Sequence, residues 1–297
     1  MMDRHDVHVA RTEDHLRSRV VRLIKNVSRC GDIQGQMDLF ENPHIVADRR
    51  NTSTPTASIH EFLDYVCDAL PSGELYLFGG ILRDVAMSGG KGFASDFDLV
   101  VEGDWAHLTE YLEKLGASRN RFGGFRLHVQ RWPVDIWSAR ETWAIREGLI
   151  PYRDIESLTR TTILNWDAIL LNWRTRVVIC PPNYFSDIQR CLMDVVLPEN
   201  PNPLGAAMRV FRHLCSKEAE LTVGAARYLG NAASRYSPEA IARTEVASYP
   251  NRVIDPTVLR FFEQLDTTSD AAVRHQLHDA MPRRFKATSG SLQTLLV

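Results

Sequence analysis

The sequence predicts an α+β domain with a mixed sheet, followed by an all-helical region, and three observations support this fold class. Short apolar runs typical of strands alternate with amphipathic helical segments between residues 58 and 182. Alanine-rich segments with helical spacing follow a proline-bounded break at 198–203. The length of 297 residues suffices for two domains, each with a core of its own.

The N-terminal part is expected to contain an amphipathic helix over residues 12–28 and a polar, turn-rich linker or arm over 31–57. Ser58 and Glu61 have the spacing of a capping box and predict a helix that extends to about Leu70. The expected parts of the chain are 1–57 (N-terminal helix and linker), 58–182 (the α+β domain) and 183–297 (the helical region).

Hydrophobic periodicity assigns the remaining elements. Residues 105–115 carry leucines at helical spacing, whereas residues 125–129 alternate apolar and polar side chains as a half-buried strand does. The other expected strands are 75–78, 97–101 and 134–137, and the other expected helices are 81–88, 204–214, 218–234, 238–248 and 255–266.

Asp96 and Asp98 stand at the beginning of the expected strand 97–101. Residues i and i+2 of a strand point the same way, so the two carboxylates are expected side by side. Adjacent carboxylates repel each other unless a cation lies between them, and oxygen ligands of this kind suit Mg²⁺. The alternative interpretation is a strand end whose polar side chains simply face solvent.

Gly79 and Gly80 separate the expected strand 75–78 from the expected helix 81–88. Paired glycines let the backbone turn sharply and approach a ligand, and the first amides of the helix then form a phosphate site. The alternative is a tight strand-to-helix turn in which Arg83 and Asp84 form an ordinary surface pair.

The whole combination of strand, Gly-Gly, helix with Arg-Asp, and Asp-x-Asp strand resembles a known family. It is similar to the head of class II CCA-adding enzymes and bacterial poly(A) polymerases, within the polymerase β-like nucleotidyltransferase superfamily. The matching residues are Gly79, Gly80, Arg83, Asp84, Asp96 and Asp98. The resemblance implies a polymerase β-like nucleotidyltransferase head, with a mixed sheet and flanking helices, followed by an all-helical neck domain.

Asp135 lies between apolar neighbours in the expected strand 134–137. Arg140 and Glu141, which follow, look like the Arg-Glu pair after the corresponding strand of the family. The resemblance therefore makes Asp135 a third carboxylate, able to hold a metal or to accept the proton of the attacking hydroxyl. The alternative is a strand-edge aspartate without a chemical role.

The resemblance weakens where the family binds its nucleotide. The family usually has Arg-Arg-Asp-Phe-Thr-Ile-Asn-Ala, whereas residues 160–168 keep the apolar framework and a single arginine, Arg160. On the expected first neck helix, Asn202 and Gly205 stand roughly where the family has an acidic residue and an arginine that read the base. These departures distinguish the chain from an ordinary CCA-adding enzyme but leave metal-dependent transfer in place.

The resemblance implies a template-independent nucleotidyltransferase that uses two Mg²⁺ ions to transfer an NMP from an NTP, either ATP or CTP, to a hydroxyl group. The expected acceptor is the 3′ end of tRNA or another RNA. Two alternatives remain: transfer to a protein or small molecule by a toxin or defence enzyme, and a non-catalytic nucleotide-binding relative. The expected catalytic and metal-binding residues are Asp96, Asp98 and Asp135, and the expected nucleotide-binding residues are Gly79, Gly80, Arg83, Ser95, Arg160, Arg209 and Arg212.

Composition limits the partners and the compartment. A formal net charge of −2 neither requires nor excludes RNA, although basic residues such as the run 283–286 are frequent late in the chain, and a protein partner stays open. No apolar run approaches the roughly 18 residues that a membrane span needs, and no hydrophobic signal region begins the sequence. Five cysteines without metal-type spacing indicate reduced thiols, so we expect a cytoplasmic protein without a membrane partner.

Overall fold

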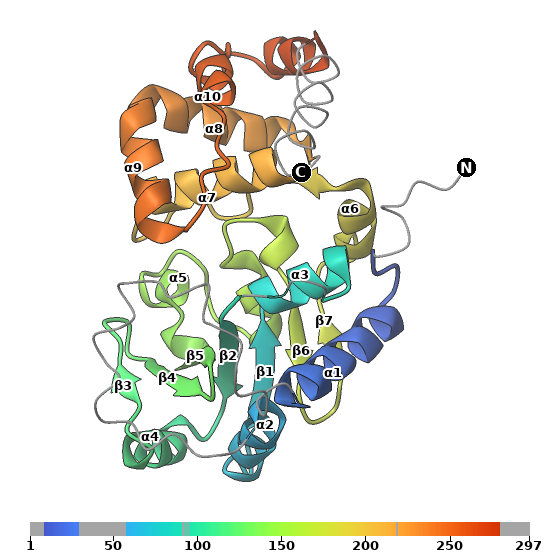
Figure 1. Cartoon of the computed structure of the whole chain (residues 1–297), viewed down its shortest axis with the longest axis vertical. Helices are drawn as coiled ribbons and strands as arrows, with labels where there is room; N and C mark the ends of the chain where they lie inside the picture. Colours follow the sequence, from blue (N-terminus) through green and yellow to red (C-terminus); the bar gives the residue numbers. More distant parts are fainter. Residues whose placement is uncertain (1–8, 30–57, 91–92, 94, 218, 280–297) are drawn as a thin grey trace. The chain divides into compact units, whose positions relative to one another are not determined.

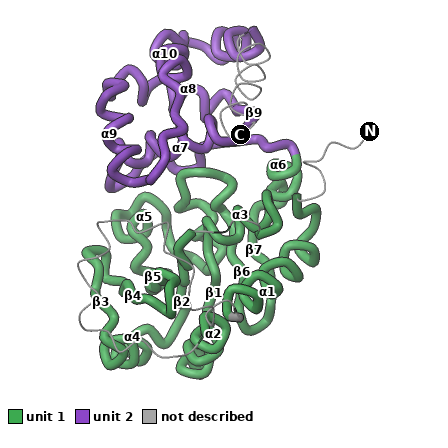
Figure 2. Tube along the Cα trace, in the orientation of Figure 1, with its two compact units in different colours: residues 1–189 green, residues 190–297 purple. Residues whose placement is uncertain are grey.

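The structure is a computed structural model that describes residues 9–29, 58–90, 93, 95–217 and 219–279. The expected linker over 31–57 and the basic run over 283–286 lie outside the described residues. The chain folds as two compact units, residues 1–189 and residues 190–297 (Figure 2).

Unit 1 contains a mixed seven-stranded sheet in the order β3-β4-β5-β2-β1-β6-β7 (Figure 1). The strands are β1 (Glu74–Phe78), β2 (Phe97–Glu102), β3 (Ser118–Arg119), β4 (Phe125–Val129), β5 (Trp132–Ser138), β6 (Leu170–Asn172) and β7 (Val178–Ile179). Within this sheet β2 and β5 pair in parallel, and all other neighbours pair antiparallel. The expectation of an α+β fold with a mixed sheet is confirmed.

Helices flank this sheet, and the sequence signals of their ends are visible. Among the described residues, the α-helices are α1 (Glu13–Arg29), α2 (Ile59–Asp68), α3 (Gly80–Ser88), α4 (Trp105–Lys114), α5 (Trp143–Arg146) and α6 (Tyr184–Arg190), and the short 3₁₀ helices are η3 (Ala139–Glu141), η4 (Ile155–Arg160) and η5 (Asn165–Asp167). Ser58 and Glu61 form the expected capping box at the start of α2. Helix α1 contacts both α2 and α3, so it is an integral part of unit 1.

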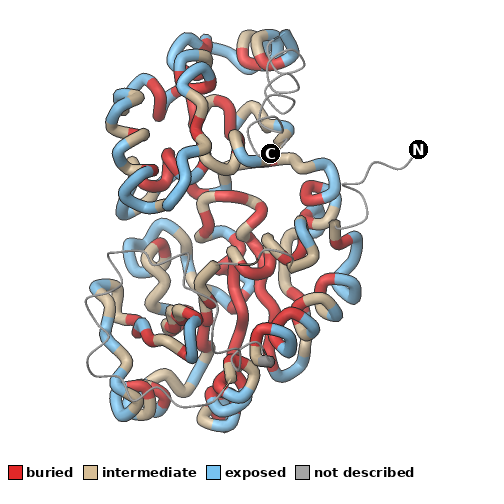
Figure 3. The backbone as a smooth tube through the Cα atoms, viewed as in Figure 1, coloured by how far each residue is buried: buried red, intermediate tan, exposed pale blue. Residues whose placement is uncertain are grey.

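The two faces of the sheet differ in character. Leu77, Leu99, Ile136 and Phe125 lie in register across four neighbouring strands and are fully buried, so one face is continuously apolar. On the other face Tyr76, Phe78 and Val100 pack with residues of η4, whereas the paired positions Asp98, Asp135 and Arg126 are polar. Figure 3 shows the buried central strands in red. The polar part of this second face contains the predicted acidic residues.

Unit 2 is mostly helical, with α7 (Pro203–Ser216), α8 (Val223–Arg235), α9 (Pro238–Ser248), α10 (Pro256–Glu263) and further helical residues at 270–279. Proline stands at the first position of α7, α9 and α10, where its missing N–H and fixed φ cost nothing. The expected helix 218–234 is shorter than predicted. Residues 220–221 form β9, which pairs in parallel with β8 (Leu192–Met193), and Thr222 then caps α8 by accepting a hydrogen bond from the amide of Ala225.

The boundary between the units falls after Gln189, later than the expected boundary after Pro182. Helix α6 accounts for the difference, because it is bonded to unit 1. The Tyr184 hydroxyl donates to the Trp166 carbonyl at 3.0 Å, and the Asn165 amide donates to the Asp187 carboxylate at 3.2 Å. No helix in the described part of the chain is both long enough and apolar enough to cross a membrane.

Candidate functional site

Asp98 and Asp135 lie directly opposite each other on the parallel strands β2 and β5. Arg126 on β4 lies directly opposite Asp135 in turn. Registered partners project from the same face of a sheet, so the three side chains form a row across three adjacent strands. Asp96, which precedes β2, completes the predicted set of acids beside this row. We call Asp96, Asp98 and Asp135 the acid cluster.

Arg126 contacts two of the three acids. Its Nη2 lies 2.5 Å from Asp96 Oδ2, and its Nε lies 3.7 Å from Asp135 Oδ1. Nothing in the sequence around Arg126 indicated a role, because its partner acids are distant in sequence and only the strand pairing brings them together. Sequence reasoning therefore missed this residue.

Asp98 is the least compensated member of the acid cluster. No hydrogen-bond donor reaches its carboxylate among the residues that the structure describes. Burial, followed by the negative charges of Asp135 and Asp96, raises the pKa of Asp98 to about 8. Burial also raises the pKa of Asp135, against the opposing effect of Arg126. The three carboxylates of the acid cluster thus concentrate negative charge at a partly buried site.

This arrangement fits a divalent cation in its donor chemistry. Carboxylate oxygens are the protein ligands that Mg²⁺ uses, and neighbouring strands lie about 4.8 Å apart, which lets Asp98 and Asp135 share one ion. As they stand, however, no three Asp, Glu, His or Cys side chains of the described residues are grouped to hold a metal ion. At this site Asp96 is paired with Arg126. Asp98 and Asp135 fit the ion directly, and Asp96 fits it once Arg126 is released.

Gly79 makes the turn from β1 into α3. Its φ of 64° and ψ of −119° lie in a region that only glycine adopts readily. Its amide donates to the Ile169 carbonyl at 3.1 Å, which ties the turn to the segment before β6. The next amides, those of Gly80 and Ile81, have no acceptor among the described residues and face outward from the start of α3.

Arg83 is held by two carboxylates. Its Nε lies 3.0 Å from Asp84 Oδ1, and its Nη1 lies 2.6 Å from Asp167 Oδ1. The other oxygen of Asp84 accepts from the Ser95 hydroxyl at 2.8 Å. Arg83 and Ser95 are therefore linked to each other beside Asp96, and both have positioning contacts within the protein.

Asp167 is a second residue that sequence reasoning missed. It lies at the end of η5, just before β6, and its negative charge contributes to the raised pKa of Asp98. A signal was present in the stretch 160–168, where Asp167 precedes the retained Ala168. Exposed Arg160 behaves differently, because no hydrogen bond or ion pair joins it to the acid cluster in the described part of the chain.

The predicted residues of unit 2 divide into two kinds. Arg209 is exposed on α7. Arg212 is engaged within unit 2, where it pairs with buried Glu245 at 2.7 Å and lies 4.1 Å from the centre of the Tyr249 ring. Asn202 caps α7 by accepting a hydrogen bond from the Gly205 amide at 3.1 Å, which gives it a structural role.

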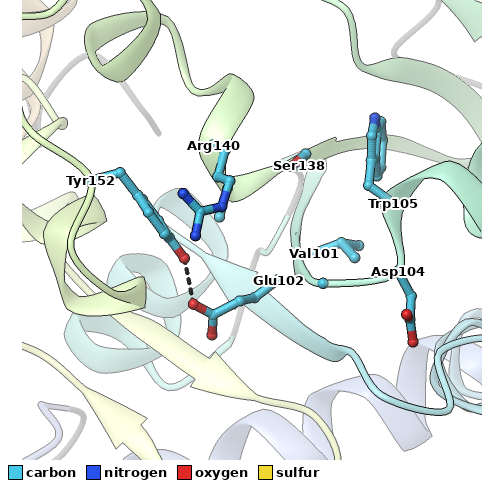
Figure 4. Close-up of a pocket in the computed structure, with 9 residues that line it drawn as sticks. Val101, Glu102, Asp104, Trp105, Ser138, Arg140 and Tyr152 are labelled. Atoms are coloured by element: carbon cyan, nitrogen blue, oxygen red, sulfur yellow. Dashed lines mark hydrogen bonds between the residues drawn. The ribbon is translucent and has the colours of Figure 1, made fainter.

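A small cavity of about 140 Å³ lies at the opposite ends of β2 and β5 (Figure 4). Glu102, at the end of β2, accepts a hydrogen bond from the Tyr152 hydroxyl there, and Arg140 lies 4.6 Å from the centre of the Tyr152 ring. Asp98 stands near the start of β2 and Asp135 in the middle of β5, and neither they nor Asp96 line this cavity, so the cavity is not part of the acid cluster.

Comparisons with known proteins concern the fold. No family model and no curated protein matches the sequence. A tRNA nucleotidyltransferase solved with a primer tRNA and an incoming ATP analogue is 15% identical, with a TM-score of 0.48, over 72% of this chain and 65% of that one. A tRNA-processing enzyme with CTP is 16% identical, with a TM-score of 0.44, over 64% of this chain and 50% of that one.

The CCA-adding enzyme of Thermotoga maritima, solved with tRNA, is also 16% identical, with a TM-score of 0.42, over 70% of this chain and 55% of that one. This chain therefore spans about half to two thirds of the length of these solved structures. At such identities the similarity extends to the fold and no further. With identities of 15–16% and TM-scores below 0.5, these similarities carry no conclusion about what this chain binds or does.

Proposed function

We propose that this chain is a metal-dependent nucleotidyltransferase whose active site is the acid cluster. The observation that carries the proposal is the register of Asp98 opposite Asp135, with Asp96 beside them and no hydrogen-bond donor at Asp98 among the described residues. Partly buried carboxylates that face each other are costly unless a cation compensates them. The motif Gly79-Gly80-x-x-Arg83-Asp84 before Asp96 supports the same function.

The proposed reaction transfers an NMP from an NTP, ATP or CTP, to a hydroxyl without a template. The acceptor oxygen forms a bond to the α-phosphorus, the bond from that phosphorus to the bridging oxygen breaks, and pyrophosphate leaves. Bound Mg²⁺ would neutralise the phosphate oxygens and lower the pKa of the attacking hydroxyl. Asp135, which lies on the same face as Asp98, is the group that accepts the hydroxyl proton.

Other residues orient the substrate in this proposal. The outward-facing amides of Gly80 and Ile81 bind phosphate oxygens, since the first amides of a helix lack internal acceptors and carry its positive dipole end. Arg83, held by Asp84 and Asp167, keeps the start of α3 beside the acid cluster. Ser95 is anchored to Asp84 and so fixes the direction from which Asp96 enters.

We infer that the acceptor is the 3′ end of tRNA or another RNA, and that the enzyme acts in the cytoplasm. A second candidate is transfer to a protein or small molecule. It is favoured because two residues of the helical region already have partners within the protein. Asn202 caps α7, and Arg212 is paired with Glu245. Neither side chain is available, as it stands, for the base-reading or phosphate contacts expected of an ordinary CCA-adding enzyme.

Labelling distinguishes these functions. The pure protein and Mg²⁺ are incubated with each α-labelled NTP in total RNA and, separately, in cell extract. Label in tRNA or another RNA supports the first function, and label in protein or a small molecule supports the second. Asp98→Asn is expected to abolish labelling, whereas Asp68→Asn, an exposed aspartate on α2, serves as the matched control and keeps it. Labelling that persists in Asp98→Asn, or no labelling by the unmodified protein, contradicts the proposal.

A further inference from the structure

We propose that Arg126 is an internal counter-cation of the acid cluster, which a divalent metal ion must displace before all three carboxylates can bind it. Arg126 would thereby set the metal affinity of the site. The inference rests on the proposed function, because it presupposes that the acid cluster binds a metal.

The position of Arg126 is fixed by the sheet. Its Cα is paired with that of Asp135, and Asp135 is paired with Asp98 on the following strand. Its alternate neighbours Phe125 and Leu127 are buried on the opposite face, so the backbone of β4 cannot turn the guanidinium away from the acids without unpacking the core. A positive charge is therefore always within reach of the acid cluster.

The guanidinium contacts carboxylates that would also hold the metal. Nη2 donates a hydrogen bond to Oδ2 of Asp96 at 2.5 Å, and Nε lies 3.7 Å from Oδ1 of Asp135. A carboxylate oxygen that accepts a short hydrogen bond from arginine has less electron density to offer a cation, and the two positive charges repel each other. Metal binding by Asp96 and the ion pair with Arg126 thus compete with each other.

The ion pair is weak enough to be displaced. The side chain of Arg126 is 47% exposed and that of Asp96 is 42% exposed, so water screens their attraction. Arg126 forms no hydrogen bond to any other side chain in the part of the chain that the structure describes. A long, half-exposed side chain held by a single side-chain hydrogen bond can swing away from Asp96 while β4 stays in place.

Arg126 differs from Arg83, which is largely buried and held by two carboxylates. Its side chain is only 12% exposed and is clamped between Asp84 and Asp167. Arg126 has the same kind of partners but neither the burial nor the second short contact. A residue meant only to stabilise the cluster would be expected to resemble Arg83.

Titration of Mn²⁺ alone, followed by the paramagnetic resonance signal of the free ion and by competition with Mg²⁺, tests the inference. Arg126→Gln is expected to bind the ion more tightly by about fivefold, the factor that an exposed ion pair is worth. Arg126→Lys, which keeps the charge but loses the fork, is expected to fall between the two. The double variant Arg126→Gln/Asp96→Asn is expected to lose the gain, which assigns it to this cluster.

Arg119→Gln is the matched control. Arg119 lies on the neighbouring strand β3, is similarly exposed and pairs with Glu113 rather than with the acid cluster. It removes the same charge from unit 1, and its affinity for Mn²⁺ is expected to stay near that of the unmodified protein. A gain equal to that of Arg126→Gln would reduce the effect to general electrostatics and overturn the inference.

The remaining outcomes separate the inference from the proposed function. Mn²⁺ binding by the unmodified protein with equal or weaker binding by Arg126→Gln overturns the inference alone. Absence of binding by both proteins overturns the inference and also counts against a metal-dependent active site. Tighter binding by Arg126→Gln, lost in the double variant and absent in Arg119→Gln, supports the inference.

Discussion

Asp98 and Asp135 occupy the same register position on the parallel strands β2 and β5, and their carboxylates project from one face of the sheet. The register of the two strands is the reason that acids so far apart in sequence meet, because paired residues on neighbouring strands lie side by side. The backbone alone therefore concentrates negative charge here. Neutral substitutions at these positions should lower the activity without lowering the stability, since they remove a reactive group and also relieve the repulsion between carboxylates.

Replacement of an acid by its neutral isostere tests the chemistry directly. Asp135→Asn is expected to lower the rate of nucleotide transfer by about a hundredfold or more, because it removes the group proposed to accept the hydroxyl proton. The melting temperature should not fall, since the amide has the same shape and relieves repulsion from Asp98. Single-turnover transfer rates and thermal unfolding on the same samples provide the measurement. A rate within a fewfold of the unmodified protein would remove Asp135 from the reaction.

The pKa of Asp98 makes the stability of the metal-free protein depend on pH. This pKa is about 8 in the folded protein, whereas an aspartate in an unfolded chain titrates near 3.9. Between these values the folded state binds more protons than the unfolded state. The contribution of Asp98 to the free energy of unfolding is therefore fully present below about pH 4 and is lost as the pH rises through about 8.

Asp98→Asn removes this dependence. In the presence of a chelator it is expected to be similar in stability to the unmodified protein at pH 4 and more stable, by several kcal/mol, at pH 9. Urea unfolding of both proteins at several pH values gives the difference. Asp68→Asn, exposed on α2, should show no such trend. A gain that is equal at pH 4 and pH 9 would show that the Asp98 pKa is not raised.

Much of the fold was accessible from local sequence patterns. The strands that became β1, β2, β4 and β5 were predicted because their apolar residues alternate or run continuously, and the capping box fixed the start of α2. The strands β6 and β7 were missed because a short apolar run without alternation does not distinguish strand from helix. The two-residue strands β8 and β9 carry no periodicity at all.

Only the acidic residues of the candidate site could be predicted from the sequence. Asp96 and Asp98 are neighbours in sequence, so a motif reveals them, and the spacing to Asp135 extends that motif. Arg126 and Asp167 were not found, because Arg126 joins the site through strand pairing with a distant segment and Asp167 through an ion pair with Arg83, which is also distant in sequence. Register is a property of the assembled sheet, and a single sequence does not specify it residue by residue.

The clamp on Arg83 predicts a large loss of stability. Arg83→Gln leaves Asp84 and Asp167 without their cation next to the acid cluster, and uncompensated charges of this burial cost about 3–5 kcal/mol. Asp167→Asn should cost less, because Asp84 still compensates the guanidinium and one negative charge near Asp98 is gone. Chemical denaturation of the single variants and of Arg83→Gln/Asp167→Asn measures the coupling. Equal stability of Arg83→Gln and the unmodified protein would contradict the clamp.

Arg212 provides the last prediction, because two roles compete for it. Its guanidinium pairs with fully buried Glu245, donates to the Asn251 carbonyl at 2.7 Å and lies over Tyr249. Glu245 Oε1 also accepts from the amides of Val253 and Ile254. Glu245 thus holds the end of α9 to the following loop. Removal of the arginine leaves this buried carboxylate without its cation.

Arg212→Gln is expected to destabilise the protein by about 3 kcal/mol or more, with little effect on the KM for NTP. Arg209→Gln, on the exposed face of the same helix, is the matched control and should leave stability nearly unchanged. Double-mutant cycles of Arg212→Gln with Glu245→Gln should give a strong coupling energy, since the two side chains share one hydrogen bond. A raised KM with unchanged stability would instead make Arg212 the phosphate contact that the family resemblance predicts.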